Sequence, residues 1–407
     1  MEEDPYILDP ALPDVRVEFG LAEAEYARRV VNRATAEQFV AIHSVLSEAR
    51  QFPELFIGHR PSGPSKDDVE FAVRAAVLDL ATRLHVSENT VLSYEHQAST
   101  LMGRTPKSWA LFREGEMSPA NARVIAQLAA ALPDVDTARV FDEQVADVAC
   151  RLAPARFAAR ARVVKARVHA EGATERHQTA REDRRVVIDP ADDGMAWLSA
   201  LLPSDVAAKI DASLETQARA LAGSEDETRT LPQIRADLFG NILTGEGTPG
   251  KVGVRVGVMI PMMSLLGLSE EPACLDGYGP IDPATARKLA AGAPSFTRIL
   301  THPVTGTVLD VDRVTEYIPA DMRRWLQYRD QVCSTPGCGK PAVYCDLDHV
   351  QDRQFGGTTR VTNLIHLCRK HHREKHHTLW KVVQTEDGST QWTSPTGNTT
   401  DADPPLF

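Results

Sequence analysis

The sequence predicts a mostly α-helical N-terminal domain with a small α+β region, followed by a small C-terminal module that binds metal. Helical periodicity begins at about residue 21 and recurs through the first half of the chain. Two short β-like runs flank the turn sequence Asp-Pro-Ala-Asp-Asp-Gly near residues 185–202. Four of the six cysteines lie between Cys333 and Cys368, beside histidines, which indicates a metal site more than a disulfide framework.

Composition places the chain among ordinary globular proteins. Hydrophobic residues make up 43% and charged residues 25% of its 407 residues. No apolar run reaches the roughly 20 residues that span a bilayer. The first ten residues, MEEDPYILDP, are acidic and lack the apolar core of a signal peptide. We therefore expect a cytoplasmic protein that does not contact a membrane.

Shifts in pattern along the chain predict five segments. We expect a loose N-terminus (1–20), a helical domain of unknown function with a β-hairpin near 185–202 (21–250), an α+β connecting region (251–320), a metal-binding module (321–384) and a flexible tail (385–407).

Residues 69–102 have the outline of a helix-turn-helix. Helical periodicity breaks at His85-Val86, and Ser87 is placed to cap a second helix that begins at Glu88. That second helix contains glutamates and a histidine but no Lys or Arg before residue 100, whereas helices that read the major groove usually carry some. The absence of basic residues favours two helices of a bundle over a DNA-reading motif.

Charge is unevenly distributed. The whole chain carries a formal net charge of −11, yet the segment 321–381 contains eleven Lys/Arg against six Asp/Glu. A basic module on an acidic chain is expected if only that module meets phosphates. A solvated surface that happens to be basic is the alternative.

The cysteines form two pairs with turn-compatible spacing. Cys333 and Cys338 are separated by Ser-Thr-Pro-Gly, and Cys368 precedes His371 by three residues. Three cysteines and one histidine are a common ligand set for a tetrahedral structural Zn²⁺. Buried free thiols are the alternative. Cys345 lies between the pairs and is expected to pack beside the zinc site without binding it.

A second set of polar residues remains once the zinc ligands are removed. Asp348 and His349 end a β-like run, Gly356-Gly357 forms a loop, and Asn363 follows. The stretch LCRKHHREKHH then has a helical appearance, and a rotation of about 100° per residue puts His372 and His376 on one face. A solvated polar helix with surplus histidines is the alternative.

This second set suits the hydrolysis of a phosphodiester. An unperturbed histidine has a pKa near neutrality, so His349 fits a general base that activates water. Asp348, His372 and His376 fit a divalent metal such as Mg²⁺ or Mn²⁺ that contacts the phosphate. Asn363 provides a neutral amide that can orient the imidazole or brace the loop.

The same residues resemble the HNH endonuclease module. The resemblance covers residues 329–380 and rests on Asp-His, Gly-Gly, Asn-Leu and Cys-x2-His-His-x3-His in this order, flanked by Cys-x4-Cys. It implies a ββα-metal fold with structural zinc, in which His349 is the base, Asn363 the middle asparagine and His372 the final histidine. Many zinc-bearing HNH modules have Cys-x2-Cys at the second pair; the spacing from Cys368 here assigns His371 to zinc and His372 to the catalytic metal.

Further stretches, among them MSPANARVIAQ and LTHPVTGTVLDVDR, resemble a bacterial group in which a long, mostly helical domain of unknown function precedes an HNH module. The resemblance implies a metal-dependent endonuclease acting on DNA, with no protein partner indicated. A zinc module that binds nucleic acid or protein without catalysis is the second hypothesis. That module would need only the three cysteines and His371, and the presence of Asp348, Asn363 and His376 at the HNH spacing favours the nuclease.

Overall fold

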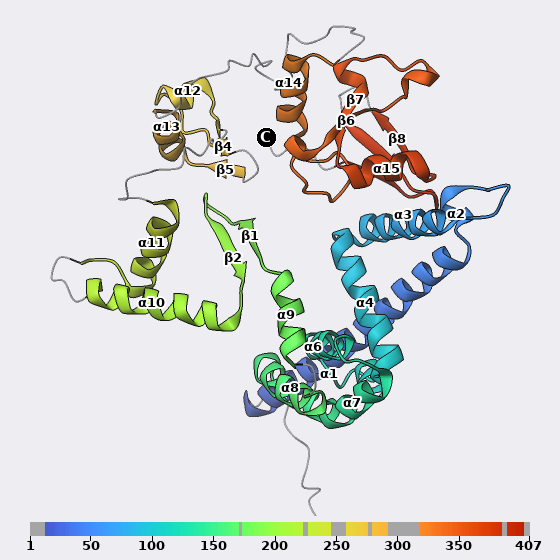
Figure 1. The fold of residues 1–407 in the computed structure, drawn as a ribbon, viewed down its shortest axis with the longest axis vertical. Helices are drawn as coiled ribbons and strands as arrows, with labels where there is room; N and C mark the ends of the chain where they lie inside the picture. Colours follow the sequence, from blue (N-terminus) through green and yellow to red (C-terminus); the bar gives the residue numbers. More distant parts are fainter. Residues whose placement is uncertain are drawn as a thin grey trace, which may run out of the picture. The chain divides into compact units, whose positions relative to one another are not determined.

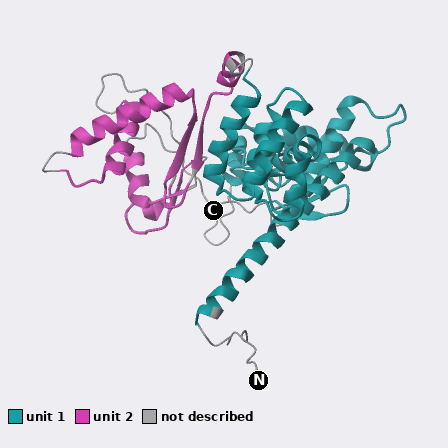
Figure 2. Cartoon of the chain, turned by 90° about the horizontal axis from the view of Figure 1, so that it is seen from below, with its two compact units in different colours: residues 1–171, 301–405, 407 teal, residues 172–300, 406 magenta. Residues whose placement is uncertain are grey.

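The computed structural model describes residues 13–170, 173–222, 227–245, 258–275, 279–291, 318–384 and 389–402. The chain divides into two compact units (Figures 1 and 2). Unit 1 combines the N-terminal helices, up to residue 171, with the C-terminal region from residue 301 onward, and unit 2 comprises residues 172–300. Unit 1 is therefore built from two segments that are far apart in the sequence.

Eight helices form the N-terminal part of unit 1. They are α1 (Pro13–Gln51), α2 (Glu54–Ile57), α3 (Lys66–Leu84), α4 (Glu88–Arg104), α5 (Pro106–Arg113), α6 (Pro119–Ala130), α7 (Val135–Ala149) and α8 (Pro154–Val168). Local signals start several of them: Ser65 forms a capping box with Asp68, and the side chain of Ser87 accepts from the backbone N–H of Thr90. No helix within the described ranges is long and apolar enough to cross a membrane.

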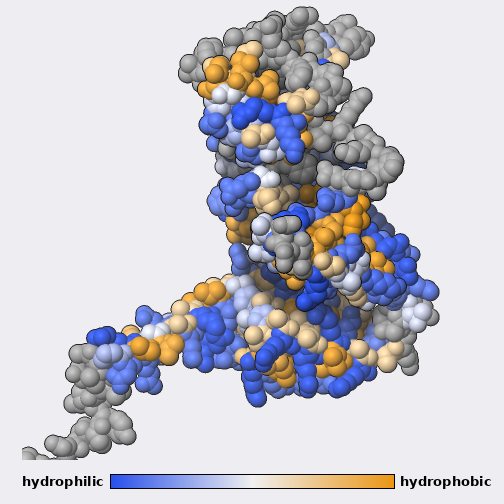
Figure 3. Space-filling model, turned by 90° about the vertical axis from the view of Figure 1, so that its left-hand side faces the viewer, coloured by the Kyte–Doolittle hydropathy of each residue, from blue (hydrophilic) through white to orange (hydrophobic). Residues whose placement is uncertain are grey.

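Aromatic side chains fill the core of this helical bundle. Phe39, Phe112, Phe141 and Phe157 are almost fully buried and belong to one apolar cluster. Among the side chains of α1 that the structure describes, the first buried one is Asn32. The half of the helix before it carries exposed apolar residues, and hydrophobic colour is visible along this helix in Figure 3. The expectation of loose chain up to residue 20 is wrong for residues 13–20, because Pro13 suits a first helical position and Asp14 the positive end of the helix.

The C-terminal part of unit 1 contains a ββα unit. Strands β6 (Asp346–His349) and β7 (Leu364–Leu367) pair antiparallel, and α15 (Arg369–His377) follows them directly (Figure 1). Helix α14 (Ala320–Asp330) precedes this unit, and a second antiparallel sheet, β8 (Lys381–Gln384), β9 (Thr390–Thr393) and β10 (Thr399–Asp401), follows it. These elements confirm the predicted fold class. A mostly helical N-terminal region precedes a small C-terminal region with antiparallel strands and a Cys₃His cluster.

One apolar core joins the two segments of unit 1. Ile42, Leu46 and Phe71 from α1 and α3 cluster with Trp380 and Trp392 from the C-terminal region. Hydrogen bonds cross the same boundary: among them, the indole N–H of Trp380 donates to the Ala75 carbonyl at 3.3 Å, and the N–H of Leu379 donates to the Phe56 carbonyl at 2.8 Å. The C-terminal region therefore shares its core with the helices.

The expected flexible tail is wrong for residues 389–402. Strand β9 pairs with both β8 and β10, and the Trp392 side chain is 0% exposed. The Thr396 hydroxyl donates to Asp79 on α3, which ties the last hairpin to the N-terminal helices. The polar sequence of this stretch gave no clear strand signal, because Trp392 is the only large apolar residue of β9. Residues 403–407 lie outside the described residues.

Unit 2 contains a hairpin and a small three-stranded sheet. Strands β1 (Arg185–Pro190) and β2 (Ala196–Leu201) form the hairpin predicted near residues 185–202, with Asp193 and Gly194 at positive φ in the turn. The other elements are α9 (Ala173–Glu182), α10 (Ser204–Ala222), α11 (Leu231–Thr244), β3 (Val258–Met259), α12 (Met262–Leu265), β4 (Ala273–Leu275), β5 (Gly279–Ile281) and α13 (Pro283–Ala291). The predicted α+β region of residues 251–320 is described only in part, since 251–257, 276–278 and 292–317 lie outside the described residues.

Replacing Trp392 by alanine is expected to lower the free energy of unfolding by about 3–5 kcal/mol, because it empties a fully buried site in the shared core. Urea unfolding followed by circular dichroism measures this change. Phe355→Ala is the control, since that ring is 73% exposed. Equal stability of Trp392→Ala and Phe355→Ala would show that the last hairpin does not contribute to the core.

Candidate metal centres

Helix α15 supplies ligand-type side chains to two separate clusters. Cys368 is the residue before the first helical position, and His371, His372 and His376 lie within the helix. At about 100° per residue, His371 projects from a different side of the helix than His372 and His376. His371 is 2% exposed, while the side chains of His372 and His376 are 35% and 39% exposed. One face of the helix is therefore buried and the other open.

The buried cluster contains the predicted zinc ligands. One ligand atom from each of Cys333, Cys338, Cys368 and His371 lies within 4.8 Å of the others. Nδ1 of His371 is 3.4 Å from the Cys333 sulfur and 3.3 Å from the Cys368 sulfur. A tetrahedral Zn²⁺ with ordinary Zn–S and Zn–N bonds holds such atoms about 3.5 Å apart. The four residues thus fit a structural zinc ion.

Backbone contacts hold the cysteine loop in place. The N–H of Cys368 donates to the Cys333 sulfur at 3.3 Å, and the indole N–H of Trp392 donates to the Ser334 carbonyl at 2.9 Å. Hydrogen bonds from neighbouring thiols, that of Cys338 foremost, lower the pKa of Cys333, and the same contact raises the pKa of Cys338. Cys345 is not in the four-residue group; its thiol donates to the Pro341 carbonyl at 3.4 Å.

The open cluster contains Asp348, His372 and His376. Nε2 of each histidine lies 3.5 Å from Oδ1 of Asp348, and the three ligand atoms are all within 4.8 Å of one another. A divalent ion about 2.1 Å from each atom requires neighbouring ligand atoms roughly 3.0–3.4 Å apart. The group therefore fits a divalent metal with positions left for other ligands, whereas the Cys₃His group is closed.

Lys375 binds one carboxylate oxygen of Asp348, while the other oxygen faces the two histidines. Its ammonium group donates to Oδ2 of Asp348 at 2.6 Å and to the His349 carbonyl, and its side chain is only 10% exposed. Oδ1 is left facing the histidines. Lys375 therefore holds the carboxylate of Asp348 in one orientation.

His349 lies next to this group but is not part of it. Its Nε2 is hydrogen-bonded to the Thr359 hydroxyl at 3.0 Å, and no group of three ligand atoms in the described residues includes it. Alternation along β6 is the reason, since Asp348 and His349 are successive residues of one strand. Burial lowers the pKa of His349 below its usual value, so its imidazole is neutral near pH 7.

Asn363 braces the loop between the two strands. Its amide accepts from the N–H of Gln351 at 2.8 Å and donates to the carbonyls of Gln351 (3.0 Å) and Thr358 (2.8 Å). Gly357 is required by this closure, because a Cβ there would lie 1.8 Å from the Gln351 carbonyl oxygen. Gly356 has φ +87°, a backbone conformation that favours glycine. Of the two roles predicted for Asn363, these contacts match the brace.

Two further histidines, left unassigned from the sequence, have structural partners. His366 is 1% exposed, and its Nδ1 bonds Asp330 at 2.8 Å. The His377 ring stacks on Phe71 with 4.5 Å between centroids. These contacts tie the ββα unit to α14 on one side and to α3 on the other.

A third group of ligand-type residues was not predicted. Glu88, the first residue of α4, lies with His371 and Glu374 within 4.8 Å. Burial would raise the pKa of Glu88, but hydrogen bonds and charges from His371 and Lys370 outweigh it and the pKa is lowered. Burial raises the pKa of Glu374 to about 7, and its two carboxyl oxygens have no hydrogen-bond partner in the described structure. Sequence spacing gives no signal for a contact between residues 88 and 371.

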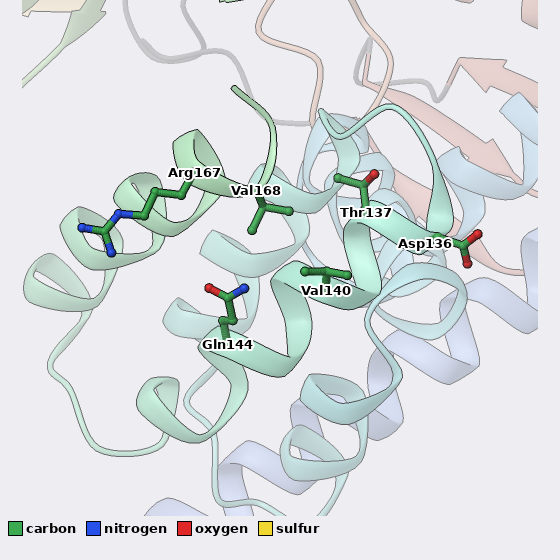
Figure 4. A pocket seen from close by; sticks show the side chains of 6 residues that line it. All are labelled: Asp136, Thr137, Val140, Gln144, Arg167 and Val168. Carbon is green, nitrogen blue, oxygen red and sulfur yellow. The ribbon is translucent and has the colours of Figure 1, made fainter. Parts of the chain in front are cut away.

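A surface hollow of about 420 Å³ lies elsewhere, between α7 and α8 (Figure 4). It is lined by Asp136, Thr137, Val140, Gln144, Arg167 and Val168. None of these residues belongs to the ligand-type groups. The hollow is therefore separate from the metal chemistry that the side chains support.

Comparison with known proteins places the chain in a family of unknown function. Residues 26–330 match the family model described as "Domain of unknown function (DUF222)", and the chain belongs to this family. It is 27% identical over 369 residues to the uncharacterized protein Rv3776 of Mycobacterium tuberculosis, covering 80% of this chain and 69% of that relative. It is also 27% identical over 378 residues to the uncharacterized protein Rv2100 of the same species, covering 80% and 68%. No solved structure matches.

The family match agrees with the resemblance to a group that has a long domain of unknown function, and its range of residues 26–330 extends past the predicted boundary at residue 250. The family match ends at residue 330, just before Cys333, so the Cys₃His group and the group of Asp348, His372 and His376 lie beyond it. The uncharacterized relatives assign no activity to these clusters.

Replacing Cys368 by serine is expected to reduce bound zinc from about one ion per chain to near zero, because it removes one of four closely spaced ligands. Metal analysis of the purified protein measures this loss. Cys345→Ser is the matched control and is expected to keep zinc. Equal zinc loss in both variants would contradict the four-residue assignment.

Replacing Asn363 by alanine is expected to speed hydrogen exchange of the Gln351 amide roughly 10-fold or more, because the amide loses its acceptor and the loop its brace. Exchange followed by NMR or mass spectrometry tests this. Gln354→Ala is the control in the same loop, since its side chain bonds only nearby Asp352. Unchanged exchange at Gln351 in Asn363→Ala would rule out the bracing role.

Proposed function

We propose that this protein is a metal-dependent endonuclease of the HNH type that hydrolyses phosphodiester bonds in DNA. The observation that carries the proposal is the open group of Asp348, His372 and His376, which adjoins His349 in the chain. A carboxylate and two imidazoles of this kind suit a divalent metal such as Mg²⁺ or Mn²⁺. The order and spacing of these residues match the HNH resemblance found in the sequence.

The protein side chains of this site have distinct tasks. A divalent ion held by Asp348, His372 and His376 would supply Lewis-acid stabilisation of charge on the phosphate and leaving oxygen. Lys375 keeps the carboxylate of Asp348 oriented, because it bonds Oδ2 and leaves Oδ1 toward the histidines. Asn363 keeps the intervening loop closed against the end of β6.

His349 is assigned as the general base. With Nε2–H donating to the Thr359 hydroxyl, the lone pair on Nδ1 can accept a proton from water. The lowered pKa of the imidazole, caused by burial, keeps it unprotonated near neutral pH. A neutral imidazole next to the phosphate site matches the requirement of proton abstraction during attack by water.

DNA fits the site as a substrate. Residues 321–381 carry eleven Lys/Arg against six Asp/Glu in a chain whose net charge is −11. His372 and His376 are about a third exposed, so a phosphate on a long duplex can approach them from solvent. Binding through phosphates is expected to weaken steeply with salt, because it releases counterions from the DNA.

A zinc module that binds nucleic acid or protein without catalysis is the alternative. It would account for the closed Cys₃His group but not for a second, open group on the other face of α15. It would also leave the pairing of Lys375 with Asp348 without a purpose. The test below separates the two functions, since only the nuclease cuts DNA.

His349→Ala is expected to lower DNA cleavage about 10²–10⁴-fold while leaving the fold and DNA affinity largely intact, because the imidazole acts only in the chemical step. The assay uses protein stripped of loosely bound metal, supercoiled plasmid, and Mg²⁺, Mn²⁺, Ni²⁺ or Zn²⁺ added singly. His377→Ala is the matched control, since that ring is exposed and stacks on Phe71. His372→Ala is expected to lose cleavage while keeping the structural zinc.

Near-normal cleavage by His349→Ala would remove His349 from the mechanism. DNA binding by the wild-type protein without cleavage under any of the four metals would favour the zinc module.

A further inference from the structure

The helical region contacts the zinc-type cluster through one buried side chain. Glu88, at the start of α4, accepts a hydrogen bond from Nε2 of His371 at 2.6 Å. Its other carboxylate oxygen accepts from the ammonium group of Lys370. The Glu88 side chain is 13% exposed and that of His371 2%, so the contact is largely shielded from water.

The two nitrogens of His371 face different partners. Nδ1 lies 3.3–3.4 Å from the sulfurs of Cys368 and Cys333, and Nε2 faces Glu88. A carboxylate can only accept, so Nε2 must carry the hydrogen in this contact. The lone pair of a neutral imidazole is then on Nδ1, directed at the cysteines. The contact with Glu88 thus selects the tautomer in which Nδ1 can bind a metal.

The backbone around Glu88 favours a carboxylate at this place. Ser87 caps α4 through the N–H of Thr90, which leaves Glu88 in the first turn at the positive end of the helix. The same turn lies against the C-terminal region, because Val91 is fully buried in the core that contains Cys333 and Leu367. Packing of α4 against the C-terminal region therefore holds the Glu88 side chain next to His371.

We propose that Glu88 is a positioning residue of the Cys₃His zinc site, and that it couples zinc binding to the docking of the α3–α4 helices on the C-terminal region. The proposal rests on zinc at the Cys₃His group and is independent of nuclease activity. Coupling is reciprocal: any gain in zinc affinity from the docked helices equals the gain in docking that zinc provides. The helical region then takes part in zinc binding, because its Glu88 bonds the zinc ligand His371.

Zinc affinity of the full-length protein tests the positioning role. Glu88→Ala is expected to bind zinc about 10–100-fold more weakly in competition with a chromophoric chelator, the usual effect of removing the partner of a ligating histidine. Glu88→Gln, which keeps an acceptor oxygen but no charge, is expected to lie between Glu88→Ala and the wild type. Glu70→Gln is the matched control, since Glu70 is an exposed acid of α3 paired with Arg74. Zinc affinity of Glu88→Ala within twofold of the wild type would overturn the proposal.

Hydrogen exchange of the wild-type chain tests the coupling and does not depend on any variant folding. Removal of zinc by a chelator is expected to speed exchange of the amides of Thr90 and Val91 at least 10-fold, while amides in α7 remain unchanged. Equal protection of Thr90 and Val91 with and without zinc would overturn the coupling. If the wild-type protein binds no zinc, the zinc assignment itself is wrong. The zinc affinity of the wild type therefore tests the site, and the change in affinity of Glu88→Ala tests the positioning role.

Discussion

Along α15, successive side chains turn by about 100°, and this constraint organises the chemistry of the C-terminal region. His371 faces the cysteines and the core, whereas His372 and His376 face Asp348 and solvent. Nine residues of helix thereby serve two clusters of opposite character, one closed and one open. The proposed structural zinc would hold the helix in place, and the open cluster depends on that placement for its geometry.

The placement of α15 depends in turn on the N-terminal helices. The core around Trp380 and Trp392 includes residues of α1 and α3, so the C-terminal region shares its larger core with the helices. A smaller cluster around Met322, Leu326 and Leu364 lies within the C-terminal region itself. A small module of this kind commonly needs a metal or a partner surface to remain folded. Here the DUF222 range provides the partner surface, since all of these core residues from α1 and α3 lie inside the matched residues 26–330. The N-terminal helices α1–α8 and the metal clusters therefore belong to one compact unit, whereas residues 172–300 of the matched range form the other.

Local patterns in the sequence were sufficient for much of the fold. The cap at Ser87, the hairpin turn at Asp193-Gly194 and the two cysteine pairs are all encoded by residues close together in the chain. The groupings of Asp348 with His372 and His376, and of three cysteines with His371, followed from helical spacing combined with the HNH resemblance, and the structure brings both sets together. Gly356 and Gly357 likewise marked a loop whose closure requires glycine.

Contacts between distant segments could not be predicted in this way. Glu88 and His371 are 283 residues apart, and the burial of Lys375 against Asp348 depends on how α15 crosses β6. The buried position of Trp392 reversed the expectation of a flexible tail for the same reason. The sequence by itself determined the helices and the hairpin, because these depend on spacing within a segment, and it determined the two ligand sets through helical spacing together with the HNH resemblance. Only the tertiary structure decided which carboxylate orients the zinc histidine and which segments share a core, because packing between segments has no local signature.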